Sequence, residues 1–302
     1  MLHNIEPYSY RFDCSSLYKN LTITAEFLEQ KILKLQQLGY NFVSMDKFLL
    51  DKQDDKEHKN IVITIDDGWK GVYSYAFPIF KKYSIPFVFY IATDLIDNGF
   101  KNCKLPELDG MNILCDYVYK ISDNKQERNN IFLKLWNKFK YKKRLLFWQD
   151  NYKILQNIYG KEFKINFDEY KQKSICSIEE LREMVESGLC ELGSHSHNHT
   201  HISRISKNKM IKQFIISKNK VENISNRECK YFSYPYGHYN LDSDKIVRNY
   251  FKSATIVKPT NLNPRKDYLI RKNDDIYRLP RILVDMSDDV DKIIQDNQDN
   301  YI

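Results

Sequence analysis

Apolar positions near the start of the chain follow a helical spacing. Between Thr24 and Gly39 they recur every three or four residues, as Phe27, Leu28, Ile32, Leu35 and Leu38. This period places them on one face of a helix. Thr24 suits the N-cap of such a helix and Gly39 suits its C-terminal end. The pattern therefore predicts an amphipathic helix over 24–39.

Beyond this helix, short apolar runs alternate with helical periods. The runs predict strands at 41–44, 61–65, 87–91, 190–192, 231–233 and 253–257. The intervening periods predict helices at 71–83, 178–187, 207–223 and 242–250. Strands that alternate with helices in this way are typical of a parallel sheet covered by helices. The pattern therefore predicts an α/β fold.

The alternation stops between residues 100 and 173, which are rich in Lys, Asn and aromatic residues and contain helical stretches. We interpret this segment as a helical insertion within a single domain that spans 1–302. Residues 101–175 hold 16 Lys and Arg against 9 Asp and Glu, so they account for the net charge of +7 of the whole chain. A lid, a docking surface for an anionic carrier and a helix on a membrane surface are the functional interpretations. The alternative is a solvated basic face.

Charge and composition exclude several classes of protein. The charges balance outside the insertion, which argues against a nucleic-acid-binding surface. The six Cys are scattered without a C-x-x-C pair, so we expect free thiols and no Cys-based zinc site. No apolar run approaches the ~20 residues of a membrane span. The first residues have neither the basic nor the apolar region of a signal peptide, so we expect a cytoplasmic protein.

Three polar clusters follow directly after predicted strands. They are Asp66-Asp67-Gly68, the segment 195–201, and Tyr234-Pro235-Tyr236-Gly237. In (β/α) barrels the C-terminal ends of the strands meet on one face, and this face carries the catalytic residues. We therefore expect the three clusters to converge, although they lie far apart in the sequence.

The first two clusters suit a metal centre. Successive residues of an extended chain point to opposite sides, so one carboxylate of Asp66 and Asp67 can bind a metal while the other acts as a base. A simple turn is the alternative. Four of the seven His lie within 195–201, where His195 and His199 can reach one cation. Imidazoles with a carboxylate suit Zn²⁺, Co²⁺, Ni²⁺ or Fe²⁺. The alternative for this segment is a solvated polar loop.

The clusters resemble the motifs of the polysaccharide deacetylase family, the NodB-homology group of carbohydrate esterases. The family motif T-F-D-D-G resembles residues 64–68, and H-[ST]-x-x-H after G-[SN] resembles residues 193–199. A third motif, F-x-Y-P-Y-G in one branch of the family, resembles residues 232–237. The resemblance covers about 61–97 and 175–285, with the same order and the same placement after strands.

The resemblance implies a role for each residue of the first two motifs. Asp66 would be the general base, and Asp67, His195 and His199 would hold one divalent metal ion. Zinc is the expected metal, with cobalt, nickel or iron as alternatives.

The third motif would contribute to binding and to the transition state. The backbone N–H of Tyr236 would help to stabilise the oxyanion of the tetrahedral intermediate. Tyr234 and His238 are candidate substrate contacts in the same cluster.

One departure from the family pattern concerns the partner of the base. Ser233 stands where the R-x-P-Y form of the third motif has its Arg, so the base needs another cation. Arg281 resembles the late Arg that the family places near the base, and Arg278 and Arg271 are alternatives.

A second departure concerns the general acid. The family's C-terminal L-x-H motif, which carries the acid His, is absent, and no His follows His238. His3 resembles the early Leu-His pair of members that act on extracellular poly-N-acetylglucosamine. We favour His3 as the acid over His238, although the first residues of a chain are often frayed.

Together these observations predict a deformed (β/α) barrel of seven strands. The predicted activity is metal-dependent removal of an N-acetyl group from an amino sugar in a carbohydrate or glycoconjugate. One alternative is a deformylase or another amidohydrolase that acts on a lipid- or nucleotide-linked amino sugar. Another is a catalytically degenerate carbohydrate-binding protein. A non-haem iron oxygenase ranks last, because the H-x-[DE] pair typical of that site is not found.

Overall fold

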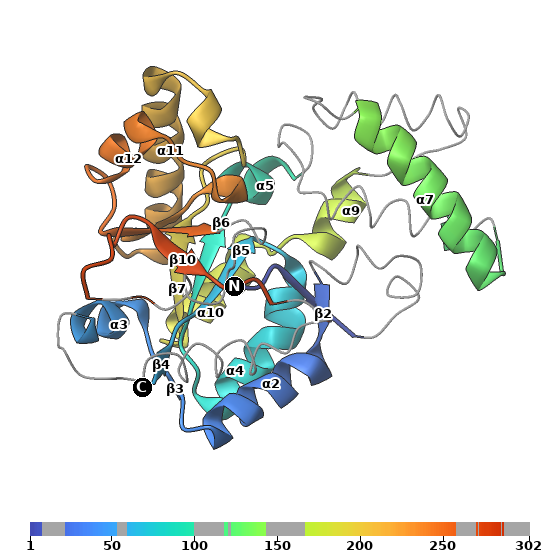
Figure 1. Cartoon of the computed structure of the whole chain (residues 1–302), viewed down its shortest axis with the longest axis horizontal. Coiled ribbons are helices and arrows are strands. Elements are labelled where there is room, and N and C mark those ends of the chain that lie inside the picture. Colours follow the sequence, from blue (N-terminus) through green and yellow to red (C-terminus); the bar gives the residue numbers. More distant parts are fainter. Residues whose placement is uncertain are drawn as a thin grey trace.

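A curled parallel sheet forms the centre of the protein (Figure 1). The computed structural model describes residues 1–7, 22–52, 59–99, 118–119, 122–142, 167–257, 270, 272–284 and 286. Within these residues the sheet has six strands in the order β10-β9-β8-β7-β6-β5. The strands are β5 (Ile63–Asp67), β6 (Phe87–Ile91), β7 (Cys190–Ser194), β8 (Tyr231–Ser233), β9 (Ser253–Val257) and β10 (Leu279–Arg281).

The N-terminal residues lie between the two edges of this sheet. Leu2 pairs in parallel with Ile65 of β5. Its backbone N–H donates to the carbonyl oxygen of Thr64 (2.8 Å), and its carbonyl oxygen accepts from the N–H of Asp66 (3.0 Å). Met1 is hydrogen-bonded to the backbone of Ile282 (2.7 Å) and Val284 (3.0 Å), just after β10. The first and last strands of the sheet are therefore joined through residues 1–2. The described residues thus form a six-stranded sheet with a single β-bridge at Leu2 between its two edges, which agrees with the expected deformed barrel and leaves the count of seven strands unconfirmed.

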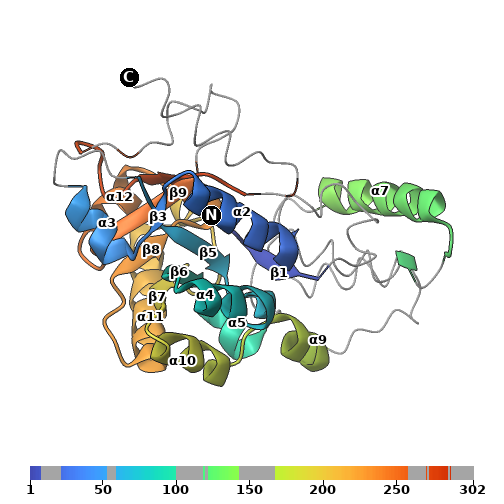
Figure 2. The ribbon, with the colours of Figure 1, turned by 90° about the horizontal axis from the view of Figure 1, so that it is seen from below.

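Helices and two small sheets surround the central sheet (Figures 1 and 2). The helices are α2 (Ala25–Gln37), α3 (Met45–Asp51), the π-helix η2 (Val72–Ala76), α4 (Phe77–Tyr83), α5 (Thr93–Asn98), α10 (Ile178–Glu186), the 3₁₀-helix η3 (Ile202–Arg204), α11 (Lys207–Ser225), the 3₁₀-helix η4 (Pro235–Gly237) and α12 (Leu241–Val247). The small parallel sheets pair β1 (Asn4–Glu6) with β2 (Thr22–Thr24) and β3 (Asn41–Phe42) with β4 (Asn60–Ile61).

The segment interpreted as an insertion contributes two described helices. They are α7 (Lys125–Lys142) and α9 (Phe167–Ser174), and α7 lies well to one side of the sheet in both views (Figures 1 and 2). Most of the rest of 100–173 lies outside the described residues. Among the described helices, none is both long enough and apolar enough to cross a membrane.

Local sequence signals account for several element boundaries. The Thr24 hydroxyl accepts a hydrogen bond from the backbone N–H of Phe27 (3.1 Å), which confirms the predicted cap of α2. Two predictions were wrong in extent. The strand expected at 41–44 stops at Phe42, because Ser44 caps the unpredicted helix α3. The run expected as one strand at 61–65 divides into β4 and β5, and β5 continues through Asp67.

Candidate metal centre and active site

The two adjacent carboxylates lie at the C-terminal end of β5. Asp66 and Asp67 are its last two residues, and each is only 2% exposed. Asp67 has a φ of 81°, a left-handed conformation that is costly for a residue with a Cβ. Strained residues of this kind concentrate at functional sites, where the surroundings hold them in place.

Two His from the end of β7 converge on Asp67. Its Oδ1 atom lies 3.6 Å from His195 Nε2 and 3.3 Å from His199 Nε2. One ligand atom from each of these three buried residues lies within 4.8 Å of the other two. The structure therefore brings together the three residues that the sequence predicted as metal ligands.

Hydrogen bonds orient two of these side chains. His195 Nδ1 lies 2.8 Å from the carbonyl oxygen of Ser233, a partner that can only accept, so Nδ1 carries the proton. The unprotonated Nε2 is then directed toward Asp67, as a metal-binding imidazole requires. Burial lowers the pKa of His195 to about 4, against the opposing charges of Asp66 and Asp67, which keeps the ring neutral at neutral pH. The indole N–H of Trp69 donates to Asp67 Oδ2 (3.0 Å).

One carboxylate oxygen of the cluster fits a bound cation. Asp67 Oδ1 and His199 Nδ1 are buried and have no hydrogen-bond partner. Burying a polar atom without a partner costs free energy, and a divalent ion bound to the carboxylate would satisfy Asp67. Two neutral imidazoles and one carboxylate are also the ligand set of many catalytic zinc sites.

Asp66 is held by an ion pair across the sheet. Arg281 Nη1 and Nη2 lie 2.7 Å from Asp66 Oδ1 and Oδ2, a bidentate geometry between the two edge strands β5 and β10. The Ser233 hydroxyl donates to Asp66 Oδ2 (3.3 Å) and accepts from Arg281 Nη2 (2.9 Å). Burial alone would raise the pKa of Asp66, but Arg281 lowers it to about 2. Asp66 is therefore ionised at neutral pH.

The alternatives to Arg281 lie elsewhere. Arg278 forms a bidentate ion pair with Asp244 of α12 (2.8 and 2.9 Å), and Arg271 lies outside the described residues.

His3 lies near the same carboxylates. The pairing of Leu2 with Ile65 carries the chain along β5 toward Asp66. His3 Nδ1 is buried without a hydrogen-bond partner. Burial lowers the pKa of the ring, while the nearby charges of Asp67 and Asp66 act to raise it. Strand β1, which follows His3, packs closely against Gly71. A Cβ at position 71 would lie 1.9 Å from the carbonyl oxygen of Ile5, so only Gly fits at this position.

The third cluster places an aromatic surface beside the metal ligands. The Tyr236 ring is 37% exposed and stacks on His201, with centroids 3.8 Å apart and planes inclined by 12°. The Tyr236 ring also lies edge-on to His199 at 4.7 Å, and the exposed His238 lies 5.7 Å from His201. Tyr236 has a φ of 61°, another left-handed conformation.

Tyr234 does not belong to this surface. Its side chain is fully buried, its ring packs against Phe232, and its hydroxyl donates to the carbonyl oxygen of Ser243 (3.5 Å). Alternation along the extended chain turns Tyr234 to the core. The expected substrate contact is therefore corrected to a packing role.

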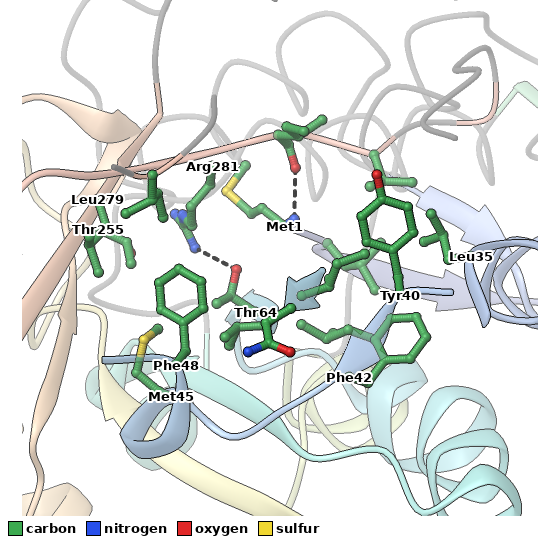
Figure 3. Close-up of a pocket in the computed structure, with 18 of the residues that line it drawn as sticks. Met1, Leu35, Tyr40, Phe42, Met45, Phe48, Thr64, Thr255, Leu279 and Arg281 are labelled. Carbon is green, nitrogen blue, oxygen red and sulfur yellow. Dashed lines mark hydrogen bonds between the residues drawn. The ribbon is translucent and has the colours of Figure 1, made fainter. Parts of the chain in front are cut away.

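A largely apolar cavity of about 280 Å³ is lined in part by Arg281 (Figure 3). Its walls come from α2, α3 and the strands at both edges of the sheet, and the hydrogen-bonded Thr64 and Arg281 are among its polar lining residues. His3, Asp67, His195 and His199 do not line it. The cavity is thus separate from the candidate metal centre.

Sequence reasoning missed the contributions of Trp69 and Ser233. Trp69 is 1% exposed and directly follows Asp66-Asp67-Gly68, so its position after the motif was the available signal. Ser233 links Asp66, Arg281 and His195. The signal for Ser233 was its place where the R-x-P-Y form carries Arg.

Comparison with known proteins agrees with this geometry. Residues 53–251 match the family described as polysaccharide deacetylase. The chain belongs to the polysaccharide deacetylase family.

One relative is the poly-beta-1,6-N-acetyl-D-glucosamine N-deacetylase of Staphylococcus aureus strain MRSA252. It is 24% identical over 294 residues, which cover 94% of this chain and 74% of the relative.

Solved structures share the fold. The Streptococcus pyogenes deacetylase PplD in complex with acetate has a TM-score of 0.65 and 16% identity, covering 98% of this chain and 95% of that one. IcaB from Ammonifex degensii has a TM-score of 0.56 and 19% identity, covering 98% and 93%.

Proposed function

We propose that this protein is a metal-dependent deacetylase that removes N-acetyl groups from an amino sugar in a carbohydrate. The observation that carries the proposal is the juxtaposition of a ligand cluster with an ionised carboxylate. Asp67, His195 and His199 converge within 4.8 Å, and Asp66 is held beside them by Arg281. A protein that only binds a carbohydrate needs neither a cluster of ligands nor a buried base.

The chain's own residues supply the other steps of amide hydrolysis. A divalent ion at Asp67, His195 and His199 would act as a Lewis acid toward the amide carbonyl and make water a better nucleophile. Asp66 would accept the proton of the attacking water, and its pKa of about 2 keeps it ready in the ionised form. Arg281 and the Ser233 hydroxyl would hold its two oxygens in a fixed orientation.

The tetrahedral intermediate of the reaction needs a partner for its oxyanion and a proton donor for the departing amine. The backbone N–H of Tyr236 would face the oxyanion, from a turn in which Tyr236 has a left-handed φ and its ring stacks on His201. His3 would protonate the departing amine. Because burial lowers its pKa, His3 would be neutral in the free protein at neutral pH, so it would take up a proton before it protonates the amine.

We further propose poly-β-1,6-N-acetylglucosamine, or an oligomer of it, as the substrate. The Staphylococcus aureus relative supports this assignment by its name. The exposed rings of Tyr236 and His238 support it by their chemistry, because an apolar ring face can pack on the C–H face of a sugar.

The test is a substrate panel with metal-loaded protein. The panel holds N-acetylglucosamine oligomers with β-1,6 and β-1,4 linkages, a nucleotide-linked N-acetyl sugar, and N-formylated counterparts. We expect acetate release from the β-1,6 oligomers, loss of the activity after chelation and its return with Zn²⁺ or Co²⁺. Formate release alone would indicate a deformylase. No acyl release from any member, with the metal bound, would overturn the proposal.

A further inference from the structure

The segment that carries both metal-ligand His is held in an unfavourable backbone conformation. Ser196 has a φ of 63° and His199 a φ of 51°, so two of its five residues are left-handed without being Gly. Such conformations persist only where the surrounding structure holds them. The contacts that hold residues 195–199 therefore determine whether His199 reaches His195 and Asp67.

Helix α5 holds one side of this segment. The backbone N–H groups of Thr93 and Asp94, at the start of α5, donate to the carbonyl oxygens of residues 196 (3.3 Å) and 197 (2.8 Å). The Thr93 hydroxyl lies 2.9 Å from His197 Nδ1. These contacts bind carbonyl groups of the segment, and they leave its N–H groups to other partners.

A single side chain from α11 accepts two of those N–H groups. Gln213 Oε1 lies 3.0 Å from the backbone N of His197 and 3.1 Å from that of Asn198. One turn further along α11, the Ser217 hydroxyl is hydrogen-bonded to the hydroxyl of Ser194 (2.7 Å), the residue before His195. Positions 213 and 217 lie on one face of α11, so this face contacts both the middle of the segment and the residue that precedes it.

We propose that Gln213 is a positioning residue of the metal centre, an inference that rests on the metal-dependent function proposed above. Its amide oxygen fixes the two peptide N–H groups between the ligands, and this sets the direction of His199. Without this acceptor the two N–H groups would be unsatisfied, and the backbone would rearrange to pair them. Ser196 and His199 would then lose their left-handed conformations. Groups that orient metal ligands typically change metal affinity about 10–100-fold when they are removed.

The test compares two substitutions of similar size. Gln213→Leu removes the acceptor, whereas Gln213→Glu keeps an oxygen that can accept both N–H groups. Asn219→Leu, at an exposed position of the same helix, is the matched control. The affinity of each metal-depleted protein for Zn²⁺ is measured by competition with a chromophoric chelator. The coordination geometry is followed by the visible spectrum of bound Co²⁺, and the unfolding temperature is measured without metal.

We expect Zn²⁺ affinity to fall about 10–100-fold in Gln213→Leu, with an altered Co²⁺ spectrum. Gln213→Glu and Asn219→Leu should keep the affinity and the spectrum of the original protein. A purely structural role would lower the unfolding temperature of Gln213→Leu while leaving affinity and spectrum unchanged, and that result would overturn the inference. If the original protein itself binds no metal, the proposed function fails, and the inference about Gln213 fails with it.

Discussion

The buried ion pair between Arg281 and Asp66 leads to a quantitative prediction of stability. Arg281 is 6% exposed and Asp66 is 2% exposed, and two contacts of 2.7 Å join them. Arg281→Met would leave the carboxylate buried without a cation. Removing one partner of a buried pair typically costs about 3–5 kcal/mol. We therefore expect the melting temperature to fall by roughly 6–20 °C.

The assays are thermal unfolding, which gives the melting temperature, and urea unfolding, which gives the free energy, both on the metal-depleted proteins at neutral pH. Asp66→Asn combined with Arg281→Met removes both charges, so the double variant should recover most of the stability that the single variant loses. Arg281→Lys keeps a charge without the bidentate geometry and should fall between the two. The reasoning is refuted if Arg281→Met unfolds at the same urea concentration as the original protein.

The pH dependence of this difference follows from the pKa of Asp66. In the original protein the folded-state pKa of about 2 lies below the ordinary value of 3.8. The pair therefore stabilises the fold fully above that ordinary value, and this stabilisation is lost as the pH falls toward 2. In Arg281→Met, burial raises the pKa of Asp66, so protonation relieves the penalty at mildly acidic pH. The gap in stability should narrow between pH 7 and 4, and a constant gap would contradict the assignment.

Two further predictions concern the metal and the basic segment. Substitution of Asp67, His195 or His199 by Ala should lower the metal content and abolish turnover, whereas Asp66→Asn should keep the metal and lose the activity. Metal analysis and acetate release measure the two effects. Full metal occupancy in the triple Ala variant would refute the ligand assignment. Charge reversal at 142–144 should weaken binding of phosphate-bearing or membrane-linked substrates in a salt-dependent way, and kinetics unchanged across salt concentrations would favour a solvated basic face.

The elements that carry strong local signals could be predicted from the sequence. The predicted strands at 231–233 and 253–257 coincide with β8 and β9, and the helix at 178–187 ends one residue early as α10. Helix α10 begins at a Ser177–Glu180 capping box, a signal contained in four consecutive residues. Such elements depend on local spacing and caps, so single-sequence reasoning finds them.

The parts that depend on tertiary contacts could not be predicted. Strand β10 has only three residues, one of them Pro280, and it exists because it pairs with β9 at the edge of the sheet. Sequence alone could name Arg281 as a partner of Asp66 only by resemblance. Arg281 reaches Asp66 because the sheet curls and brings its first and last strands together. The cytoplasmic location and the role of 100–173 stay predictions.

The last prediction separates His3 from His238 as the general acid. His3 Nδ1 is buried near Asp66 and Asp67, whereas His238 is exposed and lies beside His201. An amine leaving group needs a proton, but the phenolate of an aryl acetate departs without one. A general acid is therefore required for deacetylation of an amino sugar and dispensable for hydrolysis of an activated ester. Both reactions need the metal, the base and the oxyanion partner.

His3→Gln removes the titratable ring and keeps a side chain of similar length. We expect the turnover rate for the N-acetyl sugar to fall about 10²–10⁴-fold, with metal content and aryl-acetate hydrolysis retained. His238→Ala is the matched control, and it should raise KM for the sugar without this selective loss. Parallel loss of both activities in His3→Gln would assign His3 to holding β5 and the N-terminal segment together. A selective loss of deacetylation in His238→Ala instead would make His238 the acid, because only the proton donor separates the two reactions.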